Sequence, residues 1–160
     1  VVCAEGGAFG GAIGLMACAD IVTTTSEATF AFSETKIGLI PATVAPWVIR
    51  KTGMAFARKA FLTGLPFDGD EAFQNNLAQY VFPPDKIKPK TREIAAQIAR
   101  NAPGAIEETK KLLNRMDREI VKIDEGLTEY CSTKIAEARA SSEGQEGVDA
   151  FFSKRKPDWS

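Results

Sequence analysis

The stretch VVCAEGGAFGGAIGLMACAD, residues 1–20, constrains the fold more than any other part of the chain. An apolar run at residues 1–4 is typical of a buried strand, and a glycine cluster separates it from a segment of very small residues. Each glycine inside a helix costs roughly 1 kcal/mol relative to alanine. A strand-to-helix turn that accepts several glycines therefore needs its backbone close to a ligand or to a tightly packed neighbouring element.

The glycine turn matches neither the phosphate loop nor the dinucleotide fingerprint, because it lacks both Gly-Lys-Ser/Thr and G-x-G-x-x-G spacing. The first N–H groups of a helix have no partner within the helix and carry a partial positive charge. Residues 9–11 are therefore a candidate site for holding negative charge that develops on an oxygen atom. A small-residue helix packed on a sheet explains the same pattern, and both readings stay open at this point.

Histidine is absent, which excludes Ser-His-Asp and Cys-His catalysis and His-ligated zinc. Acid–base chemistry would fall to carboxylates, lysine, tyrosine or cysteine. The three cysteines, Cys3, Cys18 and Cys131, form no C-x-x-C pair, so no metal site is expected. We expect reduced, buried thiols in a cytoplasmic protein.

The net charge of -1 predicts no electrostatic attraction to nucleic acid or to a membrane surface. No apolar run approaches the roughly 18 residues that suggest a membrane span, and no signal peptide is visible. The chain starts with Val1 in an apolar strand whose edges would need partners. We therefore expect that residues precede Val1 in a longer protein.

Apolar periodicity and glycine or proline punctuation divide the chain into elements. The expected strands are residues 1–4, 20–25, 28–32 and 79–82. Besides the glycine-rich segment, the expected helices are residues 42–51, 54–63, 68–78, 85–101, 104–120, 124–140 and 147–154. The composition changes after residue 84, so we predict a mixed α/β region at 1–84 and a helical region at 85–160.

Five motifs occur in a specific order. They are G-A-F-G-G-A-x-G-L-x-A-C-A-D at 7–20, A-x-F-A-F-S-E at 28–34, I-G-L-I-P at 37–41, F-L-T-G at 61–64 and E-G-V-D-A-F-F-S-K-R-K-P-D-W at 146–159. In this combination the chain resembles the enoyl-CoA hydratase/isomerase (crotonase) superfamily over essentially its whole length. The stretch I-P-A-T-V-A-P-W-V-I-R at 40–50 is similar to bacterial hydratases of 3-methylglutaconyl-CoA and isohexenylglutaconyl-CoA.

The resemblance implies a crotonase-like α/β fold, in which a spiral of β-β-α units over 1–84 precedes a C-terminal helical trimerisation region at 85–160. It implies an acyl-CoA thioester substrate and a homotrimer or a dimer of trimers, without nucleic acid or membrane as partners. No cofactor is implied, because CoA is part of the substrate and backbone N–H groups stabilise the enolate.

The resemblance also implies the site residues. The Gly11 N–H would polarise the thioester carbonyl, together with a second N–H from a segment before Val1, and Glu34 would handle the proton or water. Standard hydratases carry a second glutamate at the position of Gly14, so their two-carboxylate mechanism does not carry over intact. The implied substrate-binding residues are Phe9, Gly10, Ala12, Gly14, Ser33, Ile37, Gly38 and Leu39.

Three functions remain open from the sequence. The first is a lyase that hydrates a 2,3-unsaturated acyl-CoA, of the 3-methylglutaconyl-CoA type found in leucine or terpenoid catabolism. The second is an enoyl-CoA isomerase that uses Glu34 alone. The third is an inactive fragment that serves only as a binding or oligomerisation module.

Overall fold

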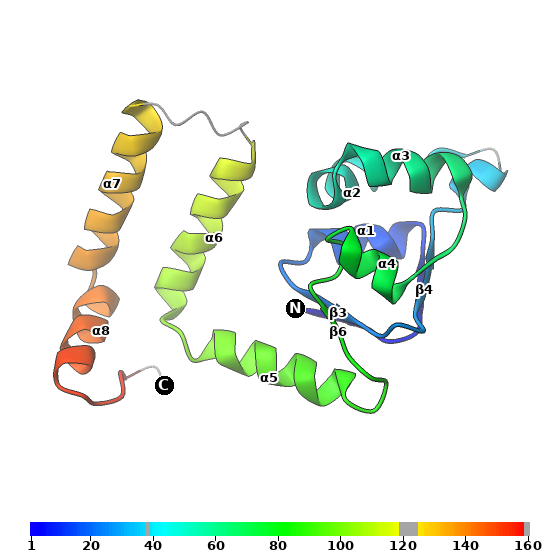
Figure 1. Ribbon diagram of the computed structural model, residues 1–160. Coiled ribbons are helices and arrows are strands. Elements are labelled where there is room, and N and C mark those ends of the chain that lie inside the picture. Colours follow the sequence, from blue (N-terminus) through cyan, green and yellow to red (C-terminus); the bar gives the residue numbers. More distant parts are fainter. Residues whose placement is uncertain (38, 119–124, 159–160) are drawn as a thin grey trace. The chain divides into compact units, whose positions relative to one another are not determined.

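A computed structural model describes residues 1–37, 39–118 and 125–158, which form two compact units, Val1–Ala95 and Ala96–Ser160 (Figure 1). The first unit is mixed α/β and the second is helical. Composition predicts a division at residue 84. The first unit extends past it because Ile87 and Thr91 are buried and the Thr91 and Thr23 hydroxyls lie 2.6 Å apart.

Short strands form two small sheets in the first unit. One sheet has the order β1-β3-β6 with parallel pairing, and the other has β2 parallel to β4 and β4 antiparallel to β5. The strands are β1 (Val2–Ala4), β2 (Gly7–Phe9), β3 (Val22–Thr24), β4 (Thr29–Ala31), β5 (Phe67–Asp68) and β6 (Tyr80–Val81). The predicted strands correspond to β1, β3, β4 and β6, whereas β2 and β5 were not expected.

The helices of the described residues are α1 (Gly11–Cys18), η1 (Glu34–Ile37, a 3-10 helix), α2 (Ala45–Thr52), α3 (Met54–Thr63), α4 (Gly69–Gln74), α5 (Ile87–Ala99), α6 (Pro103–Arg118), α7 (Glu125–Ala140) and α8 (Ser142–Phe152). The bounds of α3 confirm the prediction, because Gly53 precedes it and Gly64 ends it with φ 57. The short η1 was not predicted.

Several predicted helices have different ends: α2 begins at Ala45 instead of residue 42, and α5 covers Ile87–Ala99 instead of residues 85–101. The predicted helix 68–78 ends at Gln74, because the chain turns at Asn76, where φ is 63. The last helix begins at Ser142 instead of residue 147, since the Ser141 hydroxyl accepts a hydrogen bond from the Gly144 N–H at 3.0 Å. The predicted ends at residues 120 and 124 lie outside the described residues.

The core of the first unit is aromatic and threonine-rich. The Phe30 and Phe67 rings lie 5.6 Å apart, and the Phe56 ring meets Phe67 edge-on at 5.2 Å. Buried threonines on and beside β3 satisfy their hydroxyls on the segment of β1. Thr24 donates to the Ala4 carbonyl at 3.0 Å. This pairing offsets the cost of burying a hydroxyl.

The expectation of buried cysteines is wrong for Cys3 and Cys18, which are free but exposed. Cys3 alternates along β1 with Val2 and Ala4, whose side chains pack against the core, so it faces the other way. The Cys131 side chain lies outside the described set. Among the described residues, no helix has the length and apolar character needed to cross a membrane.

Candidate active site

The glycine turn joins β2 to the start of α1. Gly10 takes φ 50 and ψ -117, a conformation that side chains rarely adopt, and its N–H donates to the Ala31 carbonyl at 3.1 Å. Gly11 follows as the first residue of α1, so its N–H has no acceptor within the helix. Gly11 is exposed, and a Cβ built on it would meet no atom within 4 Å.

Parallel pairing brings Glu34 to the same turn. Phe9 of β2 lies opposite Ala31 of β4. The carboxyl ends of parallel strands therefore meet at one edge, where Gly10 and the segment after β4 come together. Glu34 opens η1 there, and its carbonyl accepts a hydrogen bond from the Leu39 N–H at 2.9 Å.

The Glu34 carboxylate faces Gly10. A Cβ placed on Gly10 would lie 3.1 Å from Glu34 Oε1, so any side chain at residue 10 would crowd the carboxylate. Glu34 Oε2 is a buried oxygen, and it has no hydrogen-bond partner among the described residues. A buried acceptor without a partner is costly in a folded protein. The oxygen is therefore placed to meet a group that the described residues do not supply.

The position that resembles the second glutamate of standard hydratases is filled by packing. Gly14 is buried, and a Cβ on it would lie 2.5 Å from Val44 Cγ1 and 3.1 Å from Val44 Cβ. Val44 is itself 5% exposed. Because valine is branched at Cβ, a rotamer change does not remove this contact. A side chain at residue 14 has no room unless Val44 is altered.

The other predicted substrate-binding residues differ in exposure. Phe9 and Leu39 are 56% and 59% exposed, Ala12 is exposed, and Ser33 is half-buried. The side chain of Ile37, and Gly38 as a whole, lie outside the described set. Gly10 and Glu34 are thus brought together, whereas Gly14 is covered by Val44. Their contacts with substrate stay predictions.

Lys51 holds the far end of α1, a role that the sequence pattern did not suggest. Its Nζ, on α2, donates to the Ala19 and Met16 carbonyls at 2.5 and 3.3 Å. Burial lowers the pKa of Lys51, while the charges of Asp20 and Cys18 oppose that shift. A cation is favourable at a helix C-terminus. Lys51 thus stabilises the end of α1 through its charge as well as through its hydrogen bonds.

Comparison with known proteins places the chain in a family. The sequence profile described as "Enoyl-CoA hydratase/isomerase" matches residues 1–160. The chain belongs to the enoyl-CoA hydratase/isomerase family. A crystal structure from Legionella pneumophila, titled as an enoyl CoA hydratase/isomerase (crotonase), is 42% identical with a TM-score of 0.92, over 97% of this chain and 59% of that one. The predicted crotonase-like α/β fold is thereby confirmed.

Curated members of the family carry different names. The mitochondrial Delta(3,5)-Delta(2,4)-dienoyl-CoA isomerase of Dictyostelium discoideum is 34% identical over 96% of this chain and 52% of its own. The mevalonyl-coenzyme A hydratase sidH of Aspergillus fumigatus is 30% identical over 99% of this chain and 59% of its own. This enoyl-CoA hydratase/isomerase chain therefore spans only about half to three-fifths of the length of these relatives.

Among the described residues, no group of His, Cys, Asp and Glu is arranged to hold a metal ion.

Proposed function

We propose that this chain acts on the acyl part of an enoyl-CoA thioester, with Gly11 and Glu34 as the reacting pair. The observation that carries the proposal is the buried, unpartnered Glu34 Oε2 beside the glycine turn. The Gly11 N–H would hold the thioester oxygen as it becomes negative. Glu34 would move the proton, because a positioned carboxyl group is a common general acid and base.

The chemistry can be written with balanced protons. In an isomerisation, the Glu34 carboxylate removes a proton from one carbon, and the electron pair moves into the thioester oxygen as an enolate. The Gly11 N–H stabilises that charge, and the protonated Glu34 returns the proton to a different carbon. In a hydration, the oxygen of water bonds to C3, the electron pair of the C2=C3 bond moves into the thioester oxygen as an enolate, and Glu34 takes one proton from the water and delivers it to C2, so that the other proton stays on the new hydroxyl. CoA serves as the carrier on the substrate, and no further cofactor takes part.

Residues 40–50 are similar to hydratases of 3-methylglutaconyl-CoA. This similarity favours hydration of a substrate of that type. The relationship to a mevalonyl-coenzyme A hydratase supports a short, branched acyl chain in a general way. We place this activity in a homotrimer or a dimer of trimers, the assembly that the family resemblance implies.

Isomerisation is the second candidate, and one observation favours it. Val44 packs so closely on Gly14 that the site has no space there for a second carboxylate. One acid that both removes and returns a proton suffices for a double-bond shift, whereas hydration also requires a water molecule to be activated. The 34% identical dienoyl-CoA isomerase supports this alternative.

Isotope labelling separates these functions. The chain is incubated with 3-methylglutaconyl-CoA and with crotonyl-CoA in H2(18)O, and separately in D2O, and the acyl products are analysed by mass spectrometry. Incorporation of (18)O indicates hydration, whereas a shifted double bond without (18)O indicates isomerisation, in which deuterium uptake reports only the exchange of the Glu34 proton with solvent. Glu34→Gln should abolish either signal, and Glu27→Gln, which changes an exposed carboxylate in the turn after β3, should not.

A chimera tests the same residues in a longer chain. Residues 1–160 replace the matching 59% of the Legionella pneumophila protein, which supplies the remainder of a family member's length. Turnover in the chimera that Glu34→Gln does not reduce would refute the role of Glu34. Acyl-CoA binding without turnover, in the chain and in the chimera alike, would refute catalysis and favour a binding module.

A further inference from the structure

Glu34 lies within a segment that is fastened to the end of α3. Phe32 and Thr35 flank it closely, and both contact Phe61 in the last turn of α3. The Phe32 and Phe61 rings meet edge-on with centroids 4.7 Å apart. The Thr35 hydroxyl donates to the Phe61 carbonyl at 3.0 Å. Phe61 contributes one of the last four carbonyls of the helix, which lack partners within it.

Close packing extends this contact beyond Thr35. Gly64 ends α3 with φ 57, and a Cβ there would lie 3.1 Å from Lys36 Cε and 3.2 Å from the Phe32 carbonyl oxygen. Residues on both sides of Glu34 therefore rest against one helix end. Glu34 is the first residue of the four-residue 3-10 helix that also contains Thr35, so a shift of this short helix on the end of α3 would move the Glu34 side chain.

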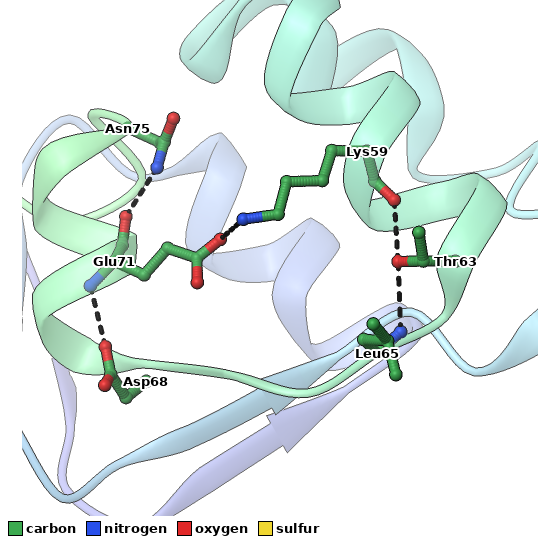
Figure 2. Close-up of polar contacts among 6 residues, drawn as sticks. All are labelled: Lys59, Thr63, Leu65, Asp68, Glu71 and Asn75. Carbon is green, nitrogen blue, oxygen red and sulfur yellow. Dashed lines mark hydrogen bonds and ion pairs between the residues drawn. The ribbon is translucent and has the colours of Figure 1, made fainter.

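Other polar contacts join α3 to α4 and to the turn that follows α3 (Figure 2). Lys59 of α3 forms an ion pair with Glu71 of α4 at 2.7 Å, and the Thr63 hydroxyl donates to the Lys59 carbonyl at 2.8 Å. That hydroxyl also accepts from the Leu65 N–H at 3.3 Å. Asp68 caps α4 by accepting from the Glu71 N–H at 2.8 Å. The ion pair to α4 holds α3 without using Thr35, whereas the Thr63 hydroxyl bonds only to residues of its own helix end.

We propose that Thr35 is a positioning residue, whose hydroxyl holds η1 on the end of α3 and thereby keeps the Glu34 carboxylate directed at Gly10. This inference rests on the proposed function for its catalytic consequence, but not for its geometry. Thr35 touches neither the glycine turn nor a reacting atom in this scheme. Its effect passes through the main chain to Glu34.

The test compares Thr35→Val, which removes the hydroxyl and keeps the branched shape, with Thr35→Ser, which keeps the hydroxyl. Thr63→Val is the matched control, since it removes a hydroxyl from the same end of α3. In the labelling assay we expect Thr35→Val to lower kcat about tenfold with KM unchanged. Thr35→Ser and Thr63→Val should stay within about twofold of the parent chain. Equal losses in all three variants, or no loss in Thr35→Val, would overturn the proposal.

A spectroscopic arm reads the geometry of the 160-residue chain without turnover. In (1)H–(15)N spectra, Glu34→Gln should shift the Gly10 amide signal, because the field of a nearby charge falls with distance. In a Thr35→Val background this response should be lost, and in a Thr35→Ser background it should be kept. If neither the parent chain nor the chimera shows turnover, the proposed function fails, and this arm alone decides the positioning role. A retained response in Thr35→Val refutes it.

Discussion

The contact between Gly14 and Val44 allows a quantitative prediction. In Gly14→Ala, the new Cβ would lie 2.5 Å from Val44 Cγ1, whereas carbon atoms normally rest about 3.5–4.0 Å apart. Helix α1 and the segment before α2 must therefore separate by about 1 Å. Overpacking of this kind costs about 1–3 kcal/mol, and the better helix propensity of alanine returns up to about 1 kcal/mol. Gly14→Ala should therefore lower the free energy of unfolding by up to about 3 kcal/mol.

Val44→Ala should enlarge the space that Gly14→Ala overfills, and it should also lower the free energy of unfolding. Val44 is 5% exposed, so the loss of two buried carbon atoms should cost about 1.5–2.5 kcal/mol including the cavity. In the double variant, the alanine at residue 14 occupies part of that cavity. The double variant should consequently be at least about 1 kcal/mol more stable than the sum of the two single changes predicts.

Urea unfolding of the four proteins measures this coupling. The fluorescence of Trp47, which lies on α2, reports the first unit when Trp159 is replaced by Phe. Equal m-values across the four proteins would show that only stability has changed. Additivity within about 0.5 kcal/mol would refute the contact. The same contact predicts that Gly14→Glu unfolds the first unit, whereas Gly14→Glu with Val44→Ala tolerates the carboxylate and gains (18)O incorporation.

Three other changes test single contacts. Gly69→Ala should cost more than about 3 kcal/mol, because its Cβ would lie 1.9 Å from the Thr25 carbonyl oxygen, whereas Gly6→Ala, with no atom within 4 Å, should stay within about 0.5 kcal/mol in the same urea assay. Gly11→Pro removes an N–H at a helix position that favours proline, so turnover should fall about 100-fold at unchanged melting temperature. Gly11→Ala keeps the N–H and should keep turnover. Equal losses of turnover in the two variants would refute the role of the N–H. Burial lowers the pKa of Lys51 below the 10.5 of an unfolded lysine. The unfolded chain therefore binds more protons than the folded chain at pH values between the lowered pKa and 10.5. Stability should rise with pH in that window, and Lys51→Met should remove that rise from urea titrations at increasing pH.

The elements predicted from the sequence are those with a strong local signal. Helix α3 has the predicted bounds because Gly53 and Gly64 both stop helices, and β3 follows a run of β-branched residues. The strands β2 and β5 were missed because neither lies in a run of apolar or β-branched residues: β2 begins at Gly7 in the glycine cluster, and β5 consists of Phe67 and Asp68 alone. Such short strands exist through their pairing with β4, which is not visible in the local sequence.

The site divides in the same way. The order of motifs pointed to Glu34 and the glycine turn, and the structure brings them together through the register of β2 and β4. Val44 and Lys51 were missed, because their contacts with α1 join residues far apart in the sequence. An apolar residue and a lysine near a helix carry no signal of such a contact. Their roles follow only from tertiary packing.

Most glycines of the first stretch are explained by close packing or by backbone conformation, whereas a Cβ on Gly6 or Gly11 would meet no atom within 4 Å. Gly7 is explained by packing, because a Cβ there would lie 2.9 Å from the Thr29 carbonyl oxygen, and Gly14 is explained by Val44. Gly10 is required by its φ of 50. Gly11 has neither reason, yet it opens a helix that alanine would favour. The folded chain therefore does not require a glycine at residue 11, and the role proposed for this residue rests on its N–H, which an alanine would also supply.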